Sequence, residues 1–300
     1  MLKALVLLIF WLLVAIAAVV AVVWFFSRLW HRYYLIERKP TETHWIRTLD
    51  GWRIAVHRFV PKRKTKRTPV LLCHGMGGNS LIWNFSDSNS LAKYLNQRGF
   101  EVWAVDLRGA GMSTKPSVFG HFKYDYDFYD YLERDLYEAV EHIKRTSKAK
   151  RIHFVGHSMG GMLAYAYISG QRKDDISRAA VLGTPGSLDW INMFSKLMPL
   201  VKALPYLPFA PLARAAAPLF EPFPALGKLI GANVENLERR YVVYQAANLS
   251  ERVPSLLIKQ FMGCRRKVRE LLSDGANWEK IRSVPDNYRL KTLRFYYLFD

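Results

Sequence analysis

The first strong pattern along the chain is an unbroken apolar run near its amino terminus, residues 5–26. A helix of that length rises about 33 Å, enough to cross a bilayer hydrocarbon core of about 30 Å. Trp24, Trp30, Tyr33 and Tyr34 gather near its carboxyl end, and such aromatic side chains favour a membrane–water interface. We therefore expect residues 1–30 to form a transmembrane anchor and residues 31–44 a juxtamembrane linker.

Two other interpretations of this run compete with an anchor. A secretory signal peptide has a shorter apolar region and a small-x-small cleavage site, which residues 24–28 (WFFSR) do not resemble. A buried core helix is rarely so long and so apolar. The pattern favours an anchor that stays in the protein.

Positive charge predicts the orientation of the anchor and the surface it faces. Only Lys3 and the amino terminus precede the run, whereas four basic residues follow it closely: Arg28, Arg32, Arg38 and Lys39. The positive-inside rule then places the body of the protein in the cytoplasm. The net charge of +19 suits anionic lipid headgroups. It would also suit nucleic acid, but no nucleic-acid-binding motif accompanies it.

Beyond the linker the pattern changes to that of a globular domain. Alternating runs at residues 45–49 and 52–59 flank Asp50-Gly51, a strong hairpin signal. Short apolar runs then alternate with helix-like segments through residues 69–184, which predicts a mainly parallel sheet with helices on both faces. The expected strands are 69–73, 100–105, 151–155 and 178–183, and the expected helices are 89–98, 124–144 and 162–169.

The next stretch breaks this alternation. Residues 184–285 are rich in proline and apolar side chains, with helix-like pieces and no clear strand. A long insertion of this kind is typical of a lid, so we expect residues 45–185 to be the core, 186–285 a helical cap, and 286–300 the start of a core strand after the cap. The apolarity suggests a hydrophobic substrate or contact with the bilayer surface, although ordinary helical packing on the sheet would give the same pattern.

Residues 156–160 (GHSMG) lie between an expected strand and an expected helix. Small residues at Gly156 and Gly160 allow a sharp turn that projects the Ser158 hydroxyl alone at the end of the sheet. The alternative is a glycine-rich turn whose serine merely caps the helix.

Three motifs together carry a resemblance over residues 45–300: HGMGG at 74–78, DLRG at 106–109 and GHSMGG at 156–161. In this order and spacing they resemble the α/β-hydrolase family, most of all its lipase and esterase branch. The resemblance implies an α/β-hydrolase fold, with a mainly parallel sheet flanked by helices and a large helical cap.

The resemblance also implies roles for individual residues. Ser158 would be the nucleophile that attacks an ester carbonyl, and Asp300, at the end of the final apolar run, would be the acid. The backbone N–H groups of Met76 and Met159 would form an oxyanion hole. The residues of the supporting loops would be His74, Gly75, Gly156 and Gly160.

The histidine of the family's triad has no counterpart at its usual place. The eight histidines are residues 31, 44, 57, 74, 121, 142, 153 and 157, and all precede Ser158, whereas the family order is serine, acid, histidine. We expect a fragment of an active hydrolase. A degenerate inactive relative, or a base supplied by His74 or His121, remain open.

The sequence therefore predicts a membrane-anchored serine hydrolase that cleaves carboxylic esters of a lipid-like or hydrophobic acyl substrate through an acyl-Ser158 intermediate. An acyltransferase on the same fold and a non-catalytic lipid-binding relative are the alternatives. Cys73 and Cys264 lie far apart and form no metal-spaced cluster, so we expect no metal and no cofactor. The expected partners are the hydrophobic ester and membrane lipids, without nucleic acid; acyl length, head group and oligomeric state stay open.

Overall fold

The computed structural model describes residues 2–170, 172–185, 195–223, 225–226 and 238–263. These residues divide into two compact units. The sheet unit is made from residues 38–207 and the segment that begins at Glu251. The helical unit joins Met1–Glu37 to Pro208–Ser250, and each unit is described by itself.

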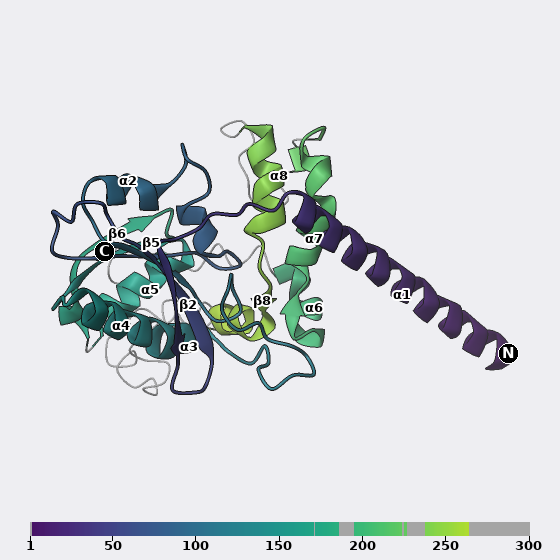
Figure 1. The fold of residues 1–300 in the computed structure, drawn as a ribbon. Helices are drawn as coiled ribbons and strands as arrows, with labels where there is room; N and C mark the ends of the chain where they lie inside the picture. Colours follow the sequence, from purple (N-terminus) through teal and green to yellow (C-terminus); the bar gives the residue numbers. More distant parts are fainter. Residues whose placement is uncertain (1, 171, 186–194, 224, 227–237, 264–300) are drawn as a thin grey trace, which may run out of the picture. The chain divides into compact units, whose positions relative to one another are not determined.

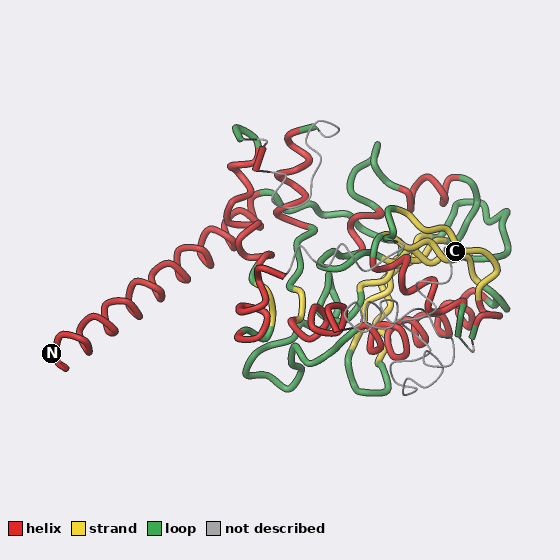
Figure 2. The backbone as a smooth tube through the Cα atoms, turned by 180° about the vertical axis from the view of Figure 1, so that it is seen from behind, coloured by secondary structure: helices red, strands yellow, loops and turns green. Residues whose placement is uncertain are grey.

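The sheet unit is built on six strands in the order β1-β2-β4-β3-β5-β6 (Figures 1 and 2). The pairs β1–β2 and β2–β4 are antiparallel, whereas β4–β3, β3–β5 and β5–β6 are parallel. The mainly parallel sheet is therefore confirmed, with an antiparallel hairpin at Asp50-Gly51 at one edge. The strands are β1 (Glu42–Arg47), β2 (Arg53–Phe59), β3 (Val70–Cys73), β4 (Val102–Asp106), β5 (Ile152–His157) and β6 (Ile176–Leu182).

The helices between the strands begin where capping side chains stand. Ser90 Oγ accepts from the N–H of Lys93 at the start of α2, and Asp127 forms a capping box with Asp130 at the start of α3. The expected helices 89–98, 124–144 and 162–169 are all present, with these caps setting their starts later than the sequence pattern alone. The segments are η1 (Ser80–Trp83), α2 (Leu91–Gln97), α3 (Phe128–Asp130), the π-helical η2 (Tyr131–Leu136), α4 (Tyr137–Ser147), α5 (Met159–Ile168) and η3 (Lys173–Asp175).

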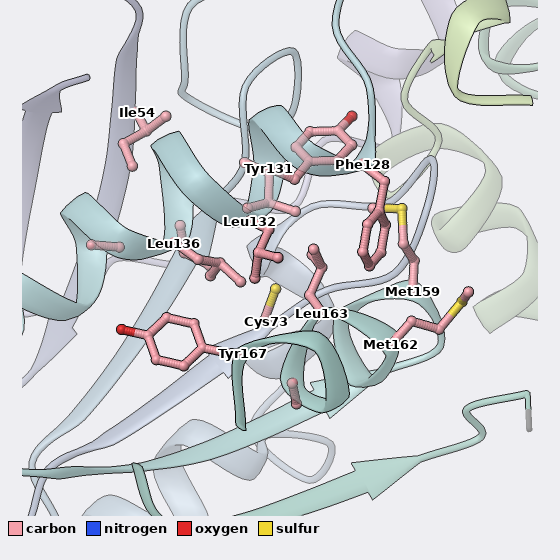
Figure 3. Close-up of a cluster of buried hydrophobic side chains, with 14 of the residues drawn as sticks. Ile54, Cys73, Phe128, Tyr131, Leu132, Leu136, Met159, Met162, Leu163 and Tyr167 are labelled. Carbon is pink, nitrogen blue, oxygen red and sulfur yellow. The ribbon is translucent and has the colours of Figure 1, made fainter. Parts of the chain in front are cut away.

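Both faces of the sheet are covered, as alternate side chains of one strand show. Leu71 and Cys73 of β3 belong to the main core, whereas Val70 and Leu72 belong to a second cluster with Trp83 of η1 and Ala92 of α2. Figure 3 shows the main core, where side chains of η2 and α5 meet around Cys73. Burial on both faces explains why β3 and β4 are continuous apolar runs.

A buried ion cluster fixes the hairpin and η2 to the loop after β4. Arg108 Nη2 lies 2.7 Å from Asp135 Oδ1, and Nη1 lies 2.7 Å from Asp50 Oδ2. The backbone N–H of Arg108 also donates to Asp135, over 2.8 Å. The guanidinium lies over the ring of Trp52, 5.1 Å from its centroid. The Asp50-Gly51 turn is thus held by a residue more than 50 positions away, with |i−j| of 58.

The segment expected to lack strands contains a short ladder. β7 (Tyr206–Leu207) pairs antiparallel with β8 (Val253–Pro254), and two residues a strand are too few to form an alternating pattern. Around this ladder, α6 (Met198–Ala203) and the helical residues 255–263 contribute Val201, Leu257 and Ile258 to the main core. The expected strand at residues 286–300 lies outside the described residues.

The regular structure described in the helical unit consists of α1 (Leu2–Tyr33), α7 (Phe209–Ala216), η5 (Ala217–Phe220) and α8 (Arg239–Asn248). Its core is made of small and branched side chains: Ala213, Ala217, Phe220, Val242, Val243, Ala246 and Ala247. The predicted apolar helix at the amino terminus is therefore present, and it is long and apolar enough to cross a membrane. Figure 1 shows α7 and α8 beside the carboxyl end of α1.

Candidate active site

Ser158 occupies a strained corner between β5 and α5. Its φ of 52° and ψ of −119° are rare for a residue with a side chain. The N–H of Ser158 donates to the carbonyl oxygen of Leu182 over 3.0 Å, and its carbonyl accepts from Gly161 over 2.9 Å. The strained conformation is therefore held from both sides, by β6 and by α5. This is the strand–turn–helix geometry that the G-x-S-x-G pattern predicts.

The two glycines of this pattern permit close packing that no other residue allows. A β-carbon added at Gly156 would lie 2.3 Å from the carbonyl oxygen of Gly160, and one added at Gly160 would lie 2.4 Å from that of Cys73. Both distances are far below van der Waals contact, and the obstructing atoms are backbone. The first turn of α5 can therefore rest on the end of β3 only with glycine at these positions.

The loop after β3 runs directly beside Ser158. A β-carbon added at Gly75 would lie 2.9 Å from the Ser158 β-carbon. The loop then closes a tight turn in which Gly78 N–H donates to Gly75 over 3.2 Å and Gly77 has a φ of 69°. Met76 lies in this turn, and Met159 is the first residue of α5, whose N–H has no intrahelical partner by position. The structure thus brings these predicted residues together.

His74 fixes the loop through both of its ring nitrogens. The N–H of Leu107 donates to Nε2 over 3.2 Å, so Nε2 is the acceptor and Nδ1 carries the proton. Nδ1 then donates to the carbonyl oxygen of Gly75 over 2.8 Å. Burial lowers the pKa of His74, against the opposing influence of Asp106. A neutral imidazole with both nitrogens engaged is suited to holding the loop and not to moving a proton.

Asp106, at the end of β4, ties that strand to the loop after β3. Its carboxylate accepts hydrogen bonds from Ser80 N–H over 2.7 Å and Met112 N–H over 2.8 Å, and it lies 3.0 Å from His57 Nε2. Burial alone would raise the pKa of Asp106, but these partners, His57 above all, hold it well below the ordinary value. Asp106 is therefore a fixed anion behind the site.

Glu251 reaches the same loop from a distant part of the chain. Its Oε1 accepts from Asn79 Nδ2 over 3.1 Å and from Gly111 N–H over 2.9 Å, while Lys115 Nζ lies 2.9 Å from Oε2. Its own N–H donates to the carbonyl oxygen of Gly77 over 2.7 Å. Sequence reasoning missed this residue, because a single glutamate in an apolar, proline-rich stretch carries no motif.

The other half of the predicted constellation cannot be placed. Asp300 lies outside the described residues. His157, next to the serine, has a pKa lowered by burial, and its buried Nδ1 has no hydrogen-bond partner among the described residues. Within the described ranges, no three His, Cys, Asp or Glu side chains come together to hold a metal ion.

Comparison with protein families agrees with this geometry. The family model of the alpha/beta hydrolase fold matches residues 68–224, and that of the partial alpha/beta-hydrolase lipase region matches residues 33–87. The chain belongs to the α/β-hydrolase fold family, as its three motifs predict.

Within this family its similar proteins include lipases. It is 30% identical over 153 residues to Triacylglycerol lipase 1 of Arabidopsis thaliana, across 47% of this chain and 37% of the lipase. It is 29% identical over 140 residues to Gastric triacylglycerol lipase of Bos taurus, across 43% of this chain and 35% of the lipase. The match thus spans about a third of each relative's length. A solved esterase of Exiguobacterium antarcticum superposes with a TM-score of 0.45 at 19% identity, covering 69% of this chain and 72% of the esterase.

Proposed function

We propose that the protein is a serine hydrolase that cleaves carboxylic esters of hydrophobic acyl compounds, with Ser158 as the nucleophile. The observation that carries this proposal is the strained backbone of Ser158, with φ 52° and ψ −119°, held beside the glycine loop at Gly75. A strained serine at such a corner projects its hydroxyl toward a bound ester. The lipases named above support a lipid-like ester as the substrate class.

The proposed reaction has two steps. The Ser158 oxygen attacks the ester carbonyl, its proton passes to a base, and collapse of the tetrahedral intermediate leaves an acyl-serine and a free alcohol. Water then attacks the acyl-serine by the same route and releases the carboxylic acid. Asp300 is the acid we propose to orient the base, and His74, with both nitrogens engaged, is poorly suited to that base's role.

The negative charge of the intermediate needs donors in fixed positions. We assign this role to the backbone N–H groups of Met76 and Met159, from the loop after β3 and the first turn of α5. Loss of one such donor typically raises the barrier by about 3 kcal/mol. His74, Gly75, Gly156 and Gly160 support the two loops, and Asp106 and Glu251 hold the first loop from behind.

Location is part of the same proposal. The exposed apolar α1 would anchor the chain in a membrane, with Arg28 and Arg32 placing the body on the cytoplasmic side. Residues 186–285 would act as a cap that receives a hydrophobic acyl chain.

A fluorophosphonate probe tests the nucleophile, because it reacts only with an activated serine. We expect the detergent-solubilised full chain to be labelled at Ser158, and S158A to lose the label with an unchanged circular dichroism spectrum. Ser169→Ala, at the last turn of α5, is the matched control and keeps the label. Equal labelling of S158A, or a folded chain that neither labels nor hydrolyses p-nitrophenyl acyl esters, would refute the proposal.

A further inference from the structure

The helix α1 has two parts with different surroundings. Residues 3–22 are exposed on every side. From Val23 onward one face becomes covered, and Ser27 is buried. The covered positions recur at helical spacing, so they share one side of the helix, and the elements that α1 packs against are α7 and α8. These covered positions are Val23, Ser27, Trp30, His31 and Tyr34.

The carboxyl end of α1 is fastened to α8 by specific hydrogen bonds. Asn248, which is buried, accepts from the N–H of Ile36 over 2.9 Å and donates to the carbonyl oxygen of Tyr34 over 2.8 Å. His31 Nδ1 lies 2.7 Å from the carbonyl oxygen of Ala247. The end of α1 is therefore a fixed part of the helical unit and not a loose tether.

This attachment sets the depth of α7 relative to a membrane. The exposed part of α1, residues 3–22, would rise about 30 Å, the thickness of a bilayer's hydrocarbon core. Trp24 and Tyr33, both exposed, then fall at the membrane–water interface, where such side chains are favoured. Because α7 packs against the same end of α1, it lies at interfacial depth.

The outward side of α7 and the turn after it is an apolar ridge. We define this ridge as Leu212, Ala216, Leu219 and Phe223, whose spacing of four, three and four places them on one side of a helical path. Leu212 and Leu219 are each 48% exposed and Phe223 is 59% exposed. The residues that alternate with them, Ala213, Ala217 and Phe220, form the core of the unit. An exposed stripe of this size is typical of an interaction surface.

We propose that this ridge inserts into the interfacial layer of the same phospholipid bilayer that α1 crosses. The inference rests on the proposed membrane anchor and adds a second point of contact to it. A lipid surface fits the ridge better than a protein partner, because the ridge is apolar along its length and begins where α1 leaves the hydrocarbon core. The helical unit would then sit in a fixed orientation on the membrane.

An environment-sensitive fluorophore tests the ridge in the full chain. Cys264 is first replaced by serine, Cys73 is buried, and a single cysteine at Leu219 carries the probe. The protein is reconstituted into vesicles of phosphatidylcholine and phosphatidylglycerol. We expect blue-shifted emission at position 219 and at least threefold stronger quenching by lipids brominated near the glycerol end of the acyl chain than at a control position, a threshold that is about the resolution of such comparisons. Phe119, in the sheet unit and 99% exposed, is the matched control.

Each outcome separates the ridge from the anchor. Release of the chain from vesicles by alkaline carbonate would refute the anchor and this inference with it. A chain that resists carbonate, but whose probe at position 219 behaves like the probe at position 119, would overturn the ridge alone. A blue shift that grows with protein concentration and is not quenched by brominated lipid would indicate contact between copies, and would also overturn it. Fluorophosphonate labelling of Ser158 is measured on the same samples, so failure of the catalytic proposal is seen separately.

Discussion

Glu251 and Asn79 are separated by 172 positions in the sequence, yet Nδ2 of Asn79 donates to Oε1 of Glu251 over 3.1 Å. The side chain of Asn79 also accepts from Leu81 N–H at the start of η1. The backbone N–H of Glu251 donates to Gly77 in the same loop. The loop beside Ser158 is therefore held by the segment that follows α8, as well as by its neighbours in the sheet.

Replacement of Glu251 tests whether this contact positions the loop for catalysis. In Glu251→Ala the loop loses three side-chain partners, so the N–H of Met76 should spend less time aimed at the oxyanion. We expect kcat for a short acyl ester to fall roughly tenfold, about 1.4 kcal/mol in the barrier, with little change in KM. Glu251→Gln retains an acceptor for Asn79 and should recover part of kcat. A variant with a lower melting temperature but unchanged kcat in the cold would show that the contact is only structural.

The packing of the elbow gives a second prediction. Gly160→Ala forces a β-carbon to within 2.4 Å of the Cys73 carbonyl oxygen, and such overpacking costs about 1–3 kcal/mol or more. We expect a lower urea midpoint and loss of fluorophosphonate labelling. Gly263→Ala is the matched control, since a β-carbon there meets nothing within 4 Å and the residue is helical. Equal urea midpoints for the two variants would contradict the close packing.

The features predicted from sequence are those whose signals are local. The apolar run of α1, the Asp50-Gly51 hairpin and the Gly156–Gly160 corner each declare themselves within a few residues, through hydrophobic period or turn chemistry. The family resemblance then supplied the fold and the loop at His74. The partners of Arg108 and Glu251 could not be predicted, because they are chosen by tertiary packing across 27 and 140 or more positions. The π-helical turn that presents Asp135 is equally silent in the sequence.

The strain at Ser158 should be measurable as stability. A positive φ costs a residue with a β-carbon about 1–3 kcal/mol, and glycine avoids most of this cost. We expect Ser158→Gly to unfold at a higher temperature than Ser158→Ala, although both lack the nucleophile and neither labels. Calorimetry of the two variants makes the comparison. A lower melting temperature for the glycine variant would mean that the backbone at this corner is not strained.

The buried ion cluster around Arg108 should be worth more than its exposed neighbour. Arg108→Ala leaves the carboxylate of Asp135 buried without its main partner, which typically costs about 3–5 kcal/mol. Arg134 also pairs with Asp50 and Asp130 but is partly exposed, so Arg134→Ala should cost less than about 1 kcal/mol. Urea unfolding of both variants measures the difference. Similar losses would show that Asp135 finds another partner when Arg108 is removed.

Buried histidines should make the protein less stable as the pH falls. Burial lowers the pKa of His74, His142, His153 and His157 in the folded chain, whereas in the unfolded chain a histidine titrates near pH 6.5. Below that pH the unfolded state binds more protons, so the free energy of unfolding falls as the pH drops from about 7 to 5. Urea unfolding at a series of pH values measures this slope. His74→Gln removes one of the four groups and should flatten the slope; an equally steep slope would mean that His74 accepts its proton in the folded state.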